Sequence, residues 1–215
     1  MANRGILITF EGPEGSGKST QIRLLEHYLT CKKGLAVTVT REPGGTPLAE
    51  HFRDILKHHH TQERIYPATE LFLFEAGRAQ NVNEVIKPAL AEGKIVLCDR
   101  FTDSTIAYQG YARGQNLHEL EALNRLALNG VEIALTILLD LPPEAGFARA
   151  AQREETRNNF DRMESETLAF HHKVRDGFLA LAERYPARIK VFNAEQPQDV
   201  LAAAIAMEAD NVIGV

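Results

Sequence analysis

Residues 12–19 contain the feature that most constrains how this chain folds, the run Gly12-Pro13-Glu14-Gly15-Ser16-Gly17-Lys18-Ser19. Three glycines followed by Lys-Ser are typical of a loop that binds phosphate in front of a helix. Because glycine has no Cβ, successive backbone N–H groups can curl around an anion, and the next helix adds the positive end of its dipole. An apolar run at 5–10 precedes the loop, and apolar residues at helical spacing follow it at 21–29. The sequence therefore predicts a strand, a phosphate-binding loop and a helix, in that order.

The length and charge of the chain limit its architecture and its partners. Its 215 residues suit one domain, since about 100 to 200 residues per domain is typical, and we expect residues 1–215 to form a single unit. A net charge of −5 and a pI near 5.9 argue against a broad surface for nucleic acid or an anionic membrane, which needs a basic field. Two cysteines, no signal-peptide pattern and no long apolar stretch predict a cytoplasmic protein without disulfides.

Strand-like and helix-like segments alternate along the rest of the chain. Apolar, β-rich runs follow the first one at residues 35–40, 94–99, 133–139 and 188–192. Helical patterns lie at 48–57, 67–80, 83–92, 117–128, 165–184 and 198–207, and another begins at 142–144. This alternation predicts an α/β fold with a parallel sheet and right-handed crossovers.

The helix predicted over residues 67–80 carries an apolar cluster that is too wide for one stripe. Leu71, Phe72 and Phe74 lie on it together with Arg78. Such a face predicts contacts on more than one side, to the core and to a ligand or partner. A well-buried core helix is the plainer alternative.

The third predicted strand ends in a carboxylate, Asp99. Ligands of open α/β sheets bind at the carboxyl ends of the strands, so Asp99 is expected beside the phosphate loop. There it can hold the hydration shell of Mg²⁺ while the Ser19 hydroxyl reaches the metal and Lys18 reaches the outer phosphates. GTP-binding switches use a similar loop, but the Asn-Lys-x-Asp and Asp-x-x-Gly elements of that class are absent from the sequence. These observations favour phosphoryl transfer.

Arginines gather in predicted loops and near predicted strand ends. A phosphate monoester is already largely ionised at neutral pH, so a phosphate acceptor needs neutralising charge rather than a base. The number of arginines suits two phosphates held together and favours a nucleotide kinase over a nucleoside kinase. Arg149, Arg153 and Arg157 are spaced four residues apart, so they would line one face of a helix, although a solvated charged helix is the alternative. The arginines are Arg41, Arg53, Arg100, Arg149, Arg153, Arg157 and Arg162.

Two further segments have more than one interpretation. The run His58-His59-His60 could bind a metal, but adjacent residues point in different directions along a helix and no carboxylate partner is evident. A solvated helix end is therefore the favoured interpretation. The polar segment 158–162 interrupts the helical pattern between two helices, as a mobile cover over a polyanion would.

Several longer stretches match the motifs of one known family in its order and approximate spacing. They are residues 10–20, Thr40-Arg41-Glu42-Pro43-Gly44-Gly45-Thr46, 74–78, Asp99-Arg100-Phe101 with Ala107-Tyr108-Gln109-Gly110, and 160–162. The second and fourth of these are much more specific than the phosphate loop. Over nearly its whole length the chain resembles thymidylate (dTMP) kinases of the bacterial type.

The resemblance implies a three-layer P-loop NTPase fold, in which helices flank a five-stranded parallel sheet and an arginine-bearing lid spans about residues 149–162. It also implies Mg²⁺-dependent, in-line transfer of the ATP γ-phosphoryl to dTMP by a homodimer, which yields dTDP and ADP for dTTP synthesis. Ser19 and Asp99 would serve the metal. The residues implied to bind ATP are Gly12, Pro13, Glu14, Gly15, Ser16, Gly17, Lys18, Ser19, Thr20, Arg149, Arg153 and Arg157.

The same resemblance implies an acceptor site for dTMP. Arg53 and Arg100 would meet its phosphate, Phe74 would stack on thymine, and Arg78 would hydrogen-bond the base. Tyr108 would lie beside the sugar. The residues implied to bind dTMP are Glu14, Glu42, Pro43, Arg53, Phe74, Arg78, Arg100, Ser104, Thr105, Tyr108 and Gln109, and those implied in catalysis are Lys18, Arg100, Arg153 and Glu14.

Two positions distinguish this chain within the family that it resembles. One branch carries an arginine inside the phosphate loop, whereas this chain has Gly15 there, and its arginines lie in the lid segment as in the bacterial branch. Arg153 is accordingly the expected catalytic lid arginine. Phe101 stands where many relatives have tyrosine after Asp-Arg, so a contact from that hydroxyl is not expected.

Other functions remain open on the sequence. A deoxynucleoside kinase uses a similar loop and a similar Asp-Arg pair, and a nucleoside-monophosphate kinase with another base preference would share most of the site. A binding module without catalytic activity is a third possibility. Turnover of thymidine, turnover of AMP, GMP or CMP, and binding without turnover would distinguish the three.

Overall fold

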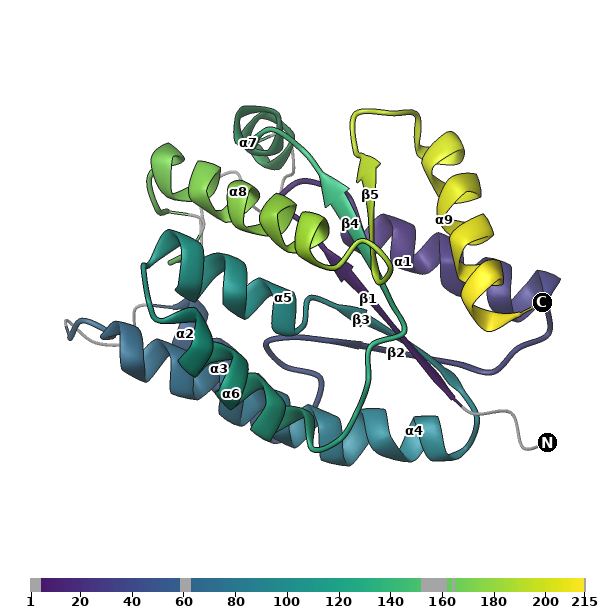
Figure 1. The fold of residues 1–215 in the computed structure, drawn as a ribbon, viewed down its shortest axis with the longest axis horizontal. Coiled ribbons are helices and arrows are strands. Elements are labelled where there is room, and N and C mark those ends of the chain that lie inside the picture. Colours follow the sequence, from purple (N-terminus) through teal and green to yellow (C-terminus); the bar gives the residue numbers. More distant parts are fainter. Residues whose placement is uncertain (1–4, 59–62, 152–161, 164, 215) are drawn as a thin grey trace.

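The computed structural model describes residues 5–58, 63–151, 162–163 and 165–214, which fold around one parallel sheet. Its strand order is β2-β3-β1-β4-β5, so the strand that leads into the phosphate loop lies in the centre (Figure 1). The strands are β1 Ile6–Glu11, β2 Val37–Arg41, β3 Ile95–Asp99, β4 Leu135–Asp140 and β5 Ile189–Asn193. Each predicted strand is confirmed to within one or two residues at most ends, and all pairs are parallel.

Helices cover both faces of this sheet. Ile8 and Phe10 of β1 pack with helices α1 and α9 on one face, while Leu7 packs with the η2–α4 segment on the other. The helical segments are α1 Lys18–His27, η1 Tyr28–Lys32, α2 Pro47–Lys57, α3 Pro67–Asn81, η2 Val82–Ile86, α4 Lys87–Ala91, α5 Thr102–Thr105, η3 Ile106–Ala112, α6 Leu117–Leu128, α7 Pro143–Ala151, α8 Leu168–Arg184 and α9 Gln198–Ile213. Alternate residues of a strand face opposite sides, which explains why β1 has buried apolar residues on both of its faces.

Two helices start where capping rules place them. The Thr46 hydroxyl accepts a hydrogen bond from the Ala49 N–H, and Pro47 occupies the first turn of α2, as predicted. The helix expected from residue 165 begins instead at Leu168, because Thr167 provides the cap through the Phe170 N–H. The last helix is longer than the predicted 198–207.

The helical segment 102–112 was not predicted from the sequence. Residues 102–105 form one helical turn that continues as a π-helical stretch to Ala112. Most of its side chains are buried against α3, α6 and α8, so a periodic polar face is missing. Tertiary packing, rather than amphipathic spacing, stabilises this segment.

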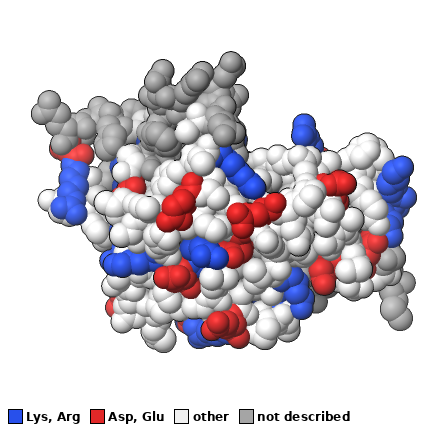
Figure 2. All heavy atoms as spheres, turned by 90° about the horizontal axis from the view of Figure 1, so that it is seen from above, with Lys and Arg blue, Asp and Glu red and all other residues white. Residues whose placement is uncertain are grey.

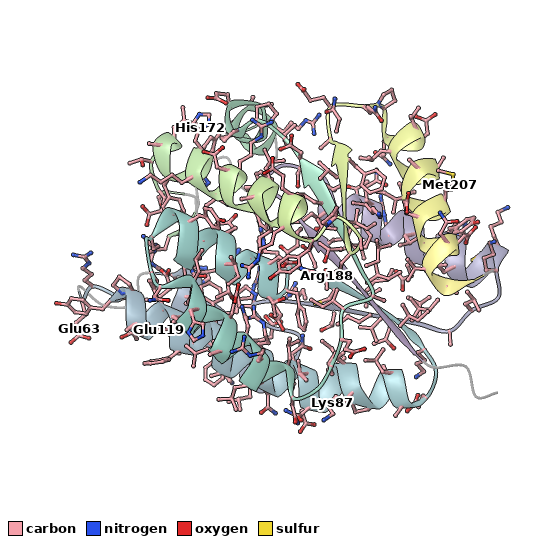
Figure 3. All side chains as sticks on the ribbon, in the orientation of Figure 1. Glu63, Lys87, Glu119, His172, Arg188 and Met207 are labelled. Atoms are coloured by element: carbon pink, nitrogen blue, oxygen red, sulfur yellow. The ribbon has the colours of Figure 1, made fainter. Side chains whose placement is uncertain are left out.

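A series of side-chain hydrogen bonds connects the helical segment 102–112 to the sheet. Arg188, labelled in Figure 3 beside the loop that leads to β5, donates to both carboxylate oxygens of Asp103 at 2.7 and 2.9 Å. It also donates to the Thr136 hydroxyl at 2.6 Å, which lies 2.8 Å from the Thr9 hydroxyl on β1. These contacts fix the start of α5 relative to β1 and β4.

The surface carries charges of both signs. On the face shown in Figure 2, lysines and arginines lie among aspartates and glutamates instead of forming one patch. Within the described part of the chain, no helix combines the length and apolarity required to cross a membrane.

Candidate active site

A cavity of about 520 Å³ opens at the carboxyl ends of the central strands. The parallel register sets Phe10 and Arg41 beside Asp99, so the loops after β1, β2 and β3 meet at one edge. All residues expected to bind dTMP line this cavity, although they come from five separate segments of the chain. They are Glu14, Glu42, Pro43, Arg53, Phe74, Arg78, Arg100, Ser104, Thr105, Tyr108 and Gln109.

The phosphate loop has the backbone that its glycines allow. Gly12, Gly15 and Gly17 all have positive φ angles, of 138°, 73° and 92°. A Cβ on Gly12 would lie 2.3 Å from the Leu139 carbonyl oxygen, and one on Gly15 would lie 2.4 Å from the Gly146 oxygen. Position 15 therefore cannot accept an arginine unless α7, which carries Gly146, moves away. This contact gives a physical reason for the glycine at that position.

Lys18 folds back onto the loop that precedes it. Its Nζ donates to the carbonyl oxygens of Gly12 at 3.1 Å and Pro13 at 2.9 Å, and contacts the Ser16 hydroxyl at 3.4 Å. Burial, and then the positive charge of Arg100, lower the pKa of Lys18 to about 8. An anionic ligand in the cavity would offset both effects, so Lys18 is suited to contact a phosphate.

Ser19 and Asp99 form a small oxygen-donor pair at the edge of the loop. The Ser19 hydroxyl donates to an Asp99 carboxylate oxygen at 3.0 Å. Among the described residues, no group of three or more histidine, cysteine or acidic side chains could enclose a metal by itself. One hydroxyl and one carboxylate fit Mg²⁺, which is commonly bound through one or two protein oxygens together with substrate phosphates and water.

Arg100 occupies a strained position directly after β3. Its φ of 64° is left-handed and uncommon for a residue with a side chain. The guanidinium donates to the Gly12 carbonyl at 3.0 Å, lies 3.4 Å from a Glu14 oxygen, and sits 5.3 Å from the centre of the Tyr108 ring. The turn thus aims one cation at the junction between the phosphate loop and the acceptor residues.

Glu11 stabilises this turn from below. Its buried carboxylate accepts hydrogen bonds from the Phe101 N–H at 2.7 Å, the Ser104 N–H at 3.2 Å and the Ser104 hydroxyl at 2.6 Å. Burial, followed by the negative charge of Asp103, raises the pKa of Glu11 to about 8. The Phe101 N–H lies at the N-cap of α5 and the Ser104 N–H in its first turn, so Glu11 caps that helix and fixes the backbone next to Arg100.

Arg78 is the centre of a buried network below the acceptor side. It is 2% exposed, and its Nε donates to Glu42 at 2.8 Å while its Nη1 donates to Glu75 at 2.8 Å. Nη1 also contacts Thr105 and Asn124, and Nη2 donates to the Phe101 carbonyl at 3.1 Å. Nη2 carries two N–H groups, so within the described part of the chain one has no partner. The expected contact to a base stays a prediction that depends on this donor.

Most of the predicted lid, including Arg153 and Arg157, lies outside the described residues. Arg149 is described, and its guanidinium donates to the Ala194 carbonyl at 3.1 Å rather than lining the cavity. Arg162 donates to the Leu56 carbonyl at 2.9 Å and pairs with Glu70. The lid's end is thereby joined to α2 and α3.

The histidine run is described only at His58. This exposed side chain, just after the end of α2, pairs with Asp54 of that helix at 2.9 Å, and His59 and His60 lie outside the described residues. The structure thus describes too little of the run to test the metal alternative.

Comparison with known proteins decides which family this site belongs to. A family model described as Thymidylate kinase matches residues 10–205. The chain belongs to the thymidylate kinase family. Thymidylate kinase of Geobacter sp. (strain M21) is 53% identical over 189 residues, which cover 87% of this chain and 83% of that protein. Thymidylate kinase of Geotalea uraniireducens (strain Rf4) is 50% identical over 203 residues, which cover 94% of each chain.

A solved structure supports the same family. The crystal structure of thymidylate kinase from Ehrlichia chaffeensis aligns with a TM-score of 0.73 and 34% identity, and covers 97% of this chain and 98% of that one. The prediction of a P-loop NTPase fold with a five-stranded parallel sheet between helices is confirmed, as is the resemblance on which it was based.

Phe101, the departure from the thymidylate kinase pattern noted in the sequence, is a core residue. Its side chain is completely buried and packs with Leu7, Val82 and Val96. The guanidinium carbon of Arg78 lies 5.5 Å from the centre of its ring. Because the ring carries no hydroxyl group, it packs in this apolar core without burying a polar atom.

Sequence reasoning missed several residues of this thymidylate kinase site. Glu11 ends β1 as Asp99 ends β3, so the same strand-end argument could have found it. Glu70 lies four residues before Phe74 and eight before Arg78, on the same face of α3, which was a usable signal. Four further cavity-lining residues carry no pattern that marks them as ligand contacts: Leu56, Lys57, Met163 and His171.

Proposed function

We propose that this chain is a dTMP kinase, which transfers the γ-phosphoryl group of ATP directly to dTMP and releases dTDP and ADP. In this step the bond from the γ-phosphorus to the β,γ-bridging oxygen breaks, and a bond to a phosphate oxygen of dTMP forms. The observation that carries the proposal is the single cavity in which a phosphate loop faces the whole expected acceptor set. Family membership supports it.

The donor side of the proposed reaction is the phosphate loop. Backbone N–H groups of the loop, from Glu14 to Ser19, would surround the β- and γ-phosphates, and Lys18 would leave the loop carbonyls to contact the oxygens that gain charge. Ser19 and Asp99 would hold Mg²⁺, which would supply positive charge to neutralise the phosphates. Arg153 of the lid segment would stabilise the remaining negative charge on the transferred phosphoryl group.

The acceptor phosphate would lie between Arg53 and Arg100. Arg53 reaches the cavity from α2, and its Nη1 already donates to the Pro43 carbonyl at 2.8 Å. Since the dTMP phosphate is largely ionised at neutral pH, no general base is needed, and positioning supplies most of the rate. Glu14, next to Arg100, would orient it and face the acceptor sugar beside Tyr108.

The acceptor base would lie deeper, against α3. Phe74 would stack on the pyrimidine, while Arg78, Thr105 and Gln109 surround its polar edge. Glu42 holds Arg78 through a hydrogen bond to its Nε.

We further propose that the chain acts as one domain over residues 1–215, in the cytoplasm.

A homodimer completes the proposal. Phe72 on α3 is 60% exposed, although the neighbouring Leu71 is buried in the core. Leu48 and Ile55 of α2, which packs against α3, are also exposed. This apolar surface suits a second copy of the chain. Light scattering coupled to size exclusion tests it, and a monomer across the micromolar range would overturn it.

A coupled ADP-release assay against a panel of acceptors tests the function. We expect dTMP to give a higher kcat/KM than AMP, GMP and CMP, and thymidine to be inactive. Preference for another monophosphate would overturn the substrate, and turnover of thymidine alone would indicate a deoxynucleoside kinase. Binding of ATP and dTMP without turnover would indicate a binding module.

A further inference from the structure

Glu70 of α3 is a buried carboxylate next to the acceptor pocket that no step above uses. Its side chain is 1% exposed, and it accepts hydrogen bonds from the Arg113 Nε at 2.9 Å and Nη2 at 3.1 Å. Arg162 pairs with it from the other side. It also accepts a hydrogen bond from the Gln109 side-chain Nε2 at 3.0 Å. Glu70 thus contacts one residue that lines the cavity and two cations.

The arginines keep this carboxyl ionised. Burial alone would raise the pKa of Glu70, but the hydrogen bonds and charge of Arg113, together with the charge of Arg162, lower it below the usual range. An ionised carboxylate has only acceptor atoms. It therefore cannot donate to the amide oxygen of Gln109.

Because Glu70 can only accept hydrogen bonds, it sets the orientation of the Gln109 side-chain amide. The amide nitrogen must face Glu70, so the amide oxygen must point away from it. Gln109 lines the cavity, and no donor of the described residues contacts its Oε1, whereas its Nε2 is held by Glu70. The oxygen is thus left for the cavity, where it offers a hydrogen-bond acceptor.

Arg78 presents the opposite character nearby. Glu42, Glu75 and Asn124 hold its guanidinium in place, and one Nη2 N–H has no partner in the part of the chain that is described. Thr105 lies beside Arg78 in the same cavity, because its hydroxyl accepts a hydrogen bond from Arg78 Nη1. The pocket wall accordingly offers a donor from Arg78 and an acceptor from Gln109.

We propose that Glu70 determines base choice by orienting Gln109, so that the pocket accepts a pyrimidine with an N3–H and a 4-carbonyl and rejects one with a bare N3 and a 4-amino group. Thymine and uracil have the first pattern, and cytosine has the second. With cytosine, two acceptors would face each other at N3 and two donors at position 4. Glu70 is a positioning residue that acts through Gln109, and the inference rests on the proposed function.

Glu70→Gln tests the orientation directly. A glutamine at position 70 can donate as well as accept, so the Gln109 amide can turn over and present its N–H₂ to the base. We expect the ratio of kcat/KM for dTMP to kcat/KM for dCMP to fall by about ten- to a hundredfold. The ratio for dTMP to dUMP should not change, because dUMP has the same N3 and 4-carbonyl groups.

Glu166→Gln is the matched control. Glu166 pairs with Arg113 at 2.8 Å and is 29% exposed, so this change removes a charge from the same cluster without touching Gln109. Its dTMP to dCMP ratio should equal that of the wild type. A purely structural role for Glu70 would lower both activities together and leave the ratio unchanged, which would overturn the proposal.

Gln109→Leu keeps the test decisive if Glu70→Gln does not fold. This variant leaves the Glu70–arginine pairs in place and removes the acceptor, so turnover of dTMP should fall while that of dCMP does not. Equal losses on both acceptors would overturn the proposal. A wild-type enzyme that prefers dTMP, with an unchanged ratio in both variants, would overturn this inference alone, whereas a wild type inactive on dTMP would overturn the proposed function as well.

Discussion

The donor and acceptor halves of the site are built in different ways. The phosphate loop is one run of eight residues, Gly12–Ser19, whose shape follows from positive φ angles at glycines. The acceptor half is assembled from α2, α3, the β3–α5 turn and η3, and its side chains are held by one another. The first is a property of local backbone, and the second is a property of packing.

The charged side chains of the two halves also have different partners. The buried cation of the donor half, Lys18, has neutral oxygen atoms of the loop as its hydrogen-bond partners. In the acceptor half, arginines meet buried carboxylates, as in the contacts of the buried Arg78 with Glu42 and Glu75 and of the partly buried Arg113 with Glu70. Removing one member of such a pair leaves a buried charge uncompensated. Changes on the donor side should therefore affect catalysis more than stability, and changes on the acceptor side should affect both.

Lys18→Ala should have the largest effect on turnover. The lost cation contacts oxygens that gain charge in the transition state, so we expect kcat/KM to fall by about 10²–10³. Because the fold already lowers the pKa of Lys18, the melting temperature should hardly change. Steady-state kinetics and thermal unfolding measure both. Lys87→Ala on α4, labelled in Figure 3, is the control and should alter neither.

Arg78→Ala should have the largest effect on stability. It strips the buried Glu42 and Glu75 carboxylates of their cation, for which we expect a loss of about 3–5 kcal/mol in the free energy of unfolding, together with weaker discrimination between bases. Urea denaturation measures it. Arg184→Ala breaks an exposed pair with Glu121, at 54% exposure of the arginine, and should cost less than about 1 kcal/mol. Similar losses for the two variants would contradict the contrast between the halves.

Glu11→Gln probes the boundary between the two halves. The pKa of Glu11 is raised from 4.5 to about 8, so its carboxyl stabilises the fold fully below about pH 4.5 and loses that contribution as the pH rises through 8. Glutamine stays neutral throughout. We therefore expect the stability of the variant, relative to wild type, to improve by about 1–3 kcal/mol between pH 5 and pH 9.

Chemical denaturation of both proteins at the two pH values measures this difference. All other titrating groups are common to both proteins and cancel. Parallel pH profiles would mean that Glu11 is ionised throughout the range.

Arg149→Ala should have the smallest effect. Its guanidinium donates to the Ala194 carbonyl at a half-buried site outside the cavity. If it contacts ATP as expected from the family, KM for ATP should rise about two- to fivefold, as for one exposed charge contact. KM for dTMP should not change. An effect on dTMP instead would place Arg149 on the acceptor side.

The extent to which the sequence predicted this molecule follows the same division. The five strands, the loop and the Thr46-capped helix were predicted because each depends on short-range patterns. The helical stretch 102–112 was not, since its buried side chains show no amphipathic period. Asp99 was found by its position at a strand end, whereas Glu11 was missed although it has the same position.

By itself the sequence determined the phosphate loop and the parallel α/β fold, because short motifs and periodicities encode them, whereas the residues expected in the acceptor pocket came from the resemblance to a known family. Only the tertiary structure decided what those residues can do. Arg78 is joined to Glu42 and Asn124 across 36 and 46 positions of the chain, and Gln109 to Glu70 across 39. The direction in which an amide or guanidinium points is set by partners that become neighbours only when the chain folds, so no local pattern can record it.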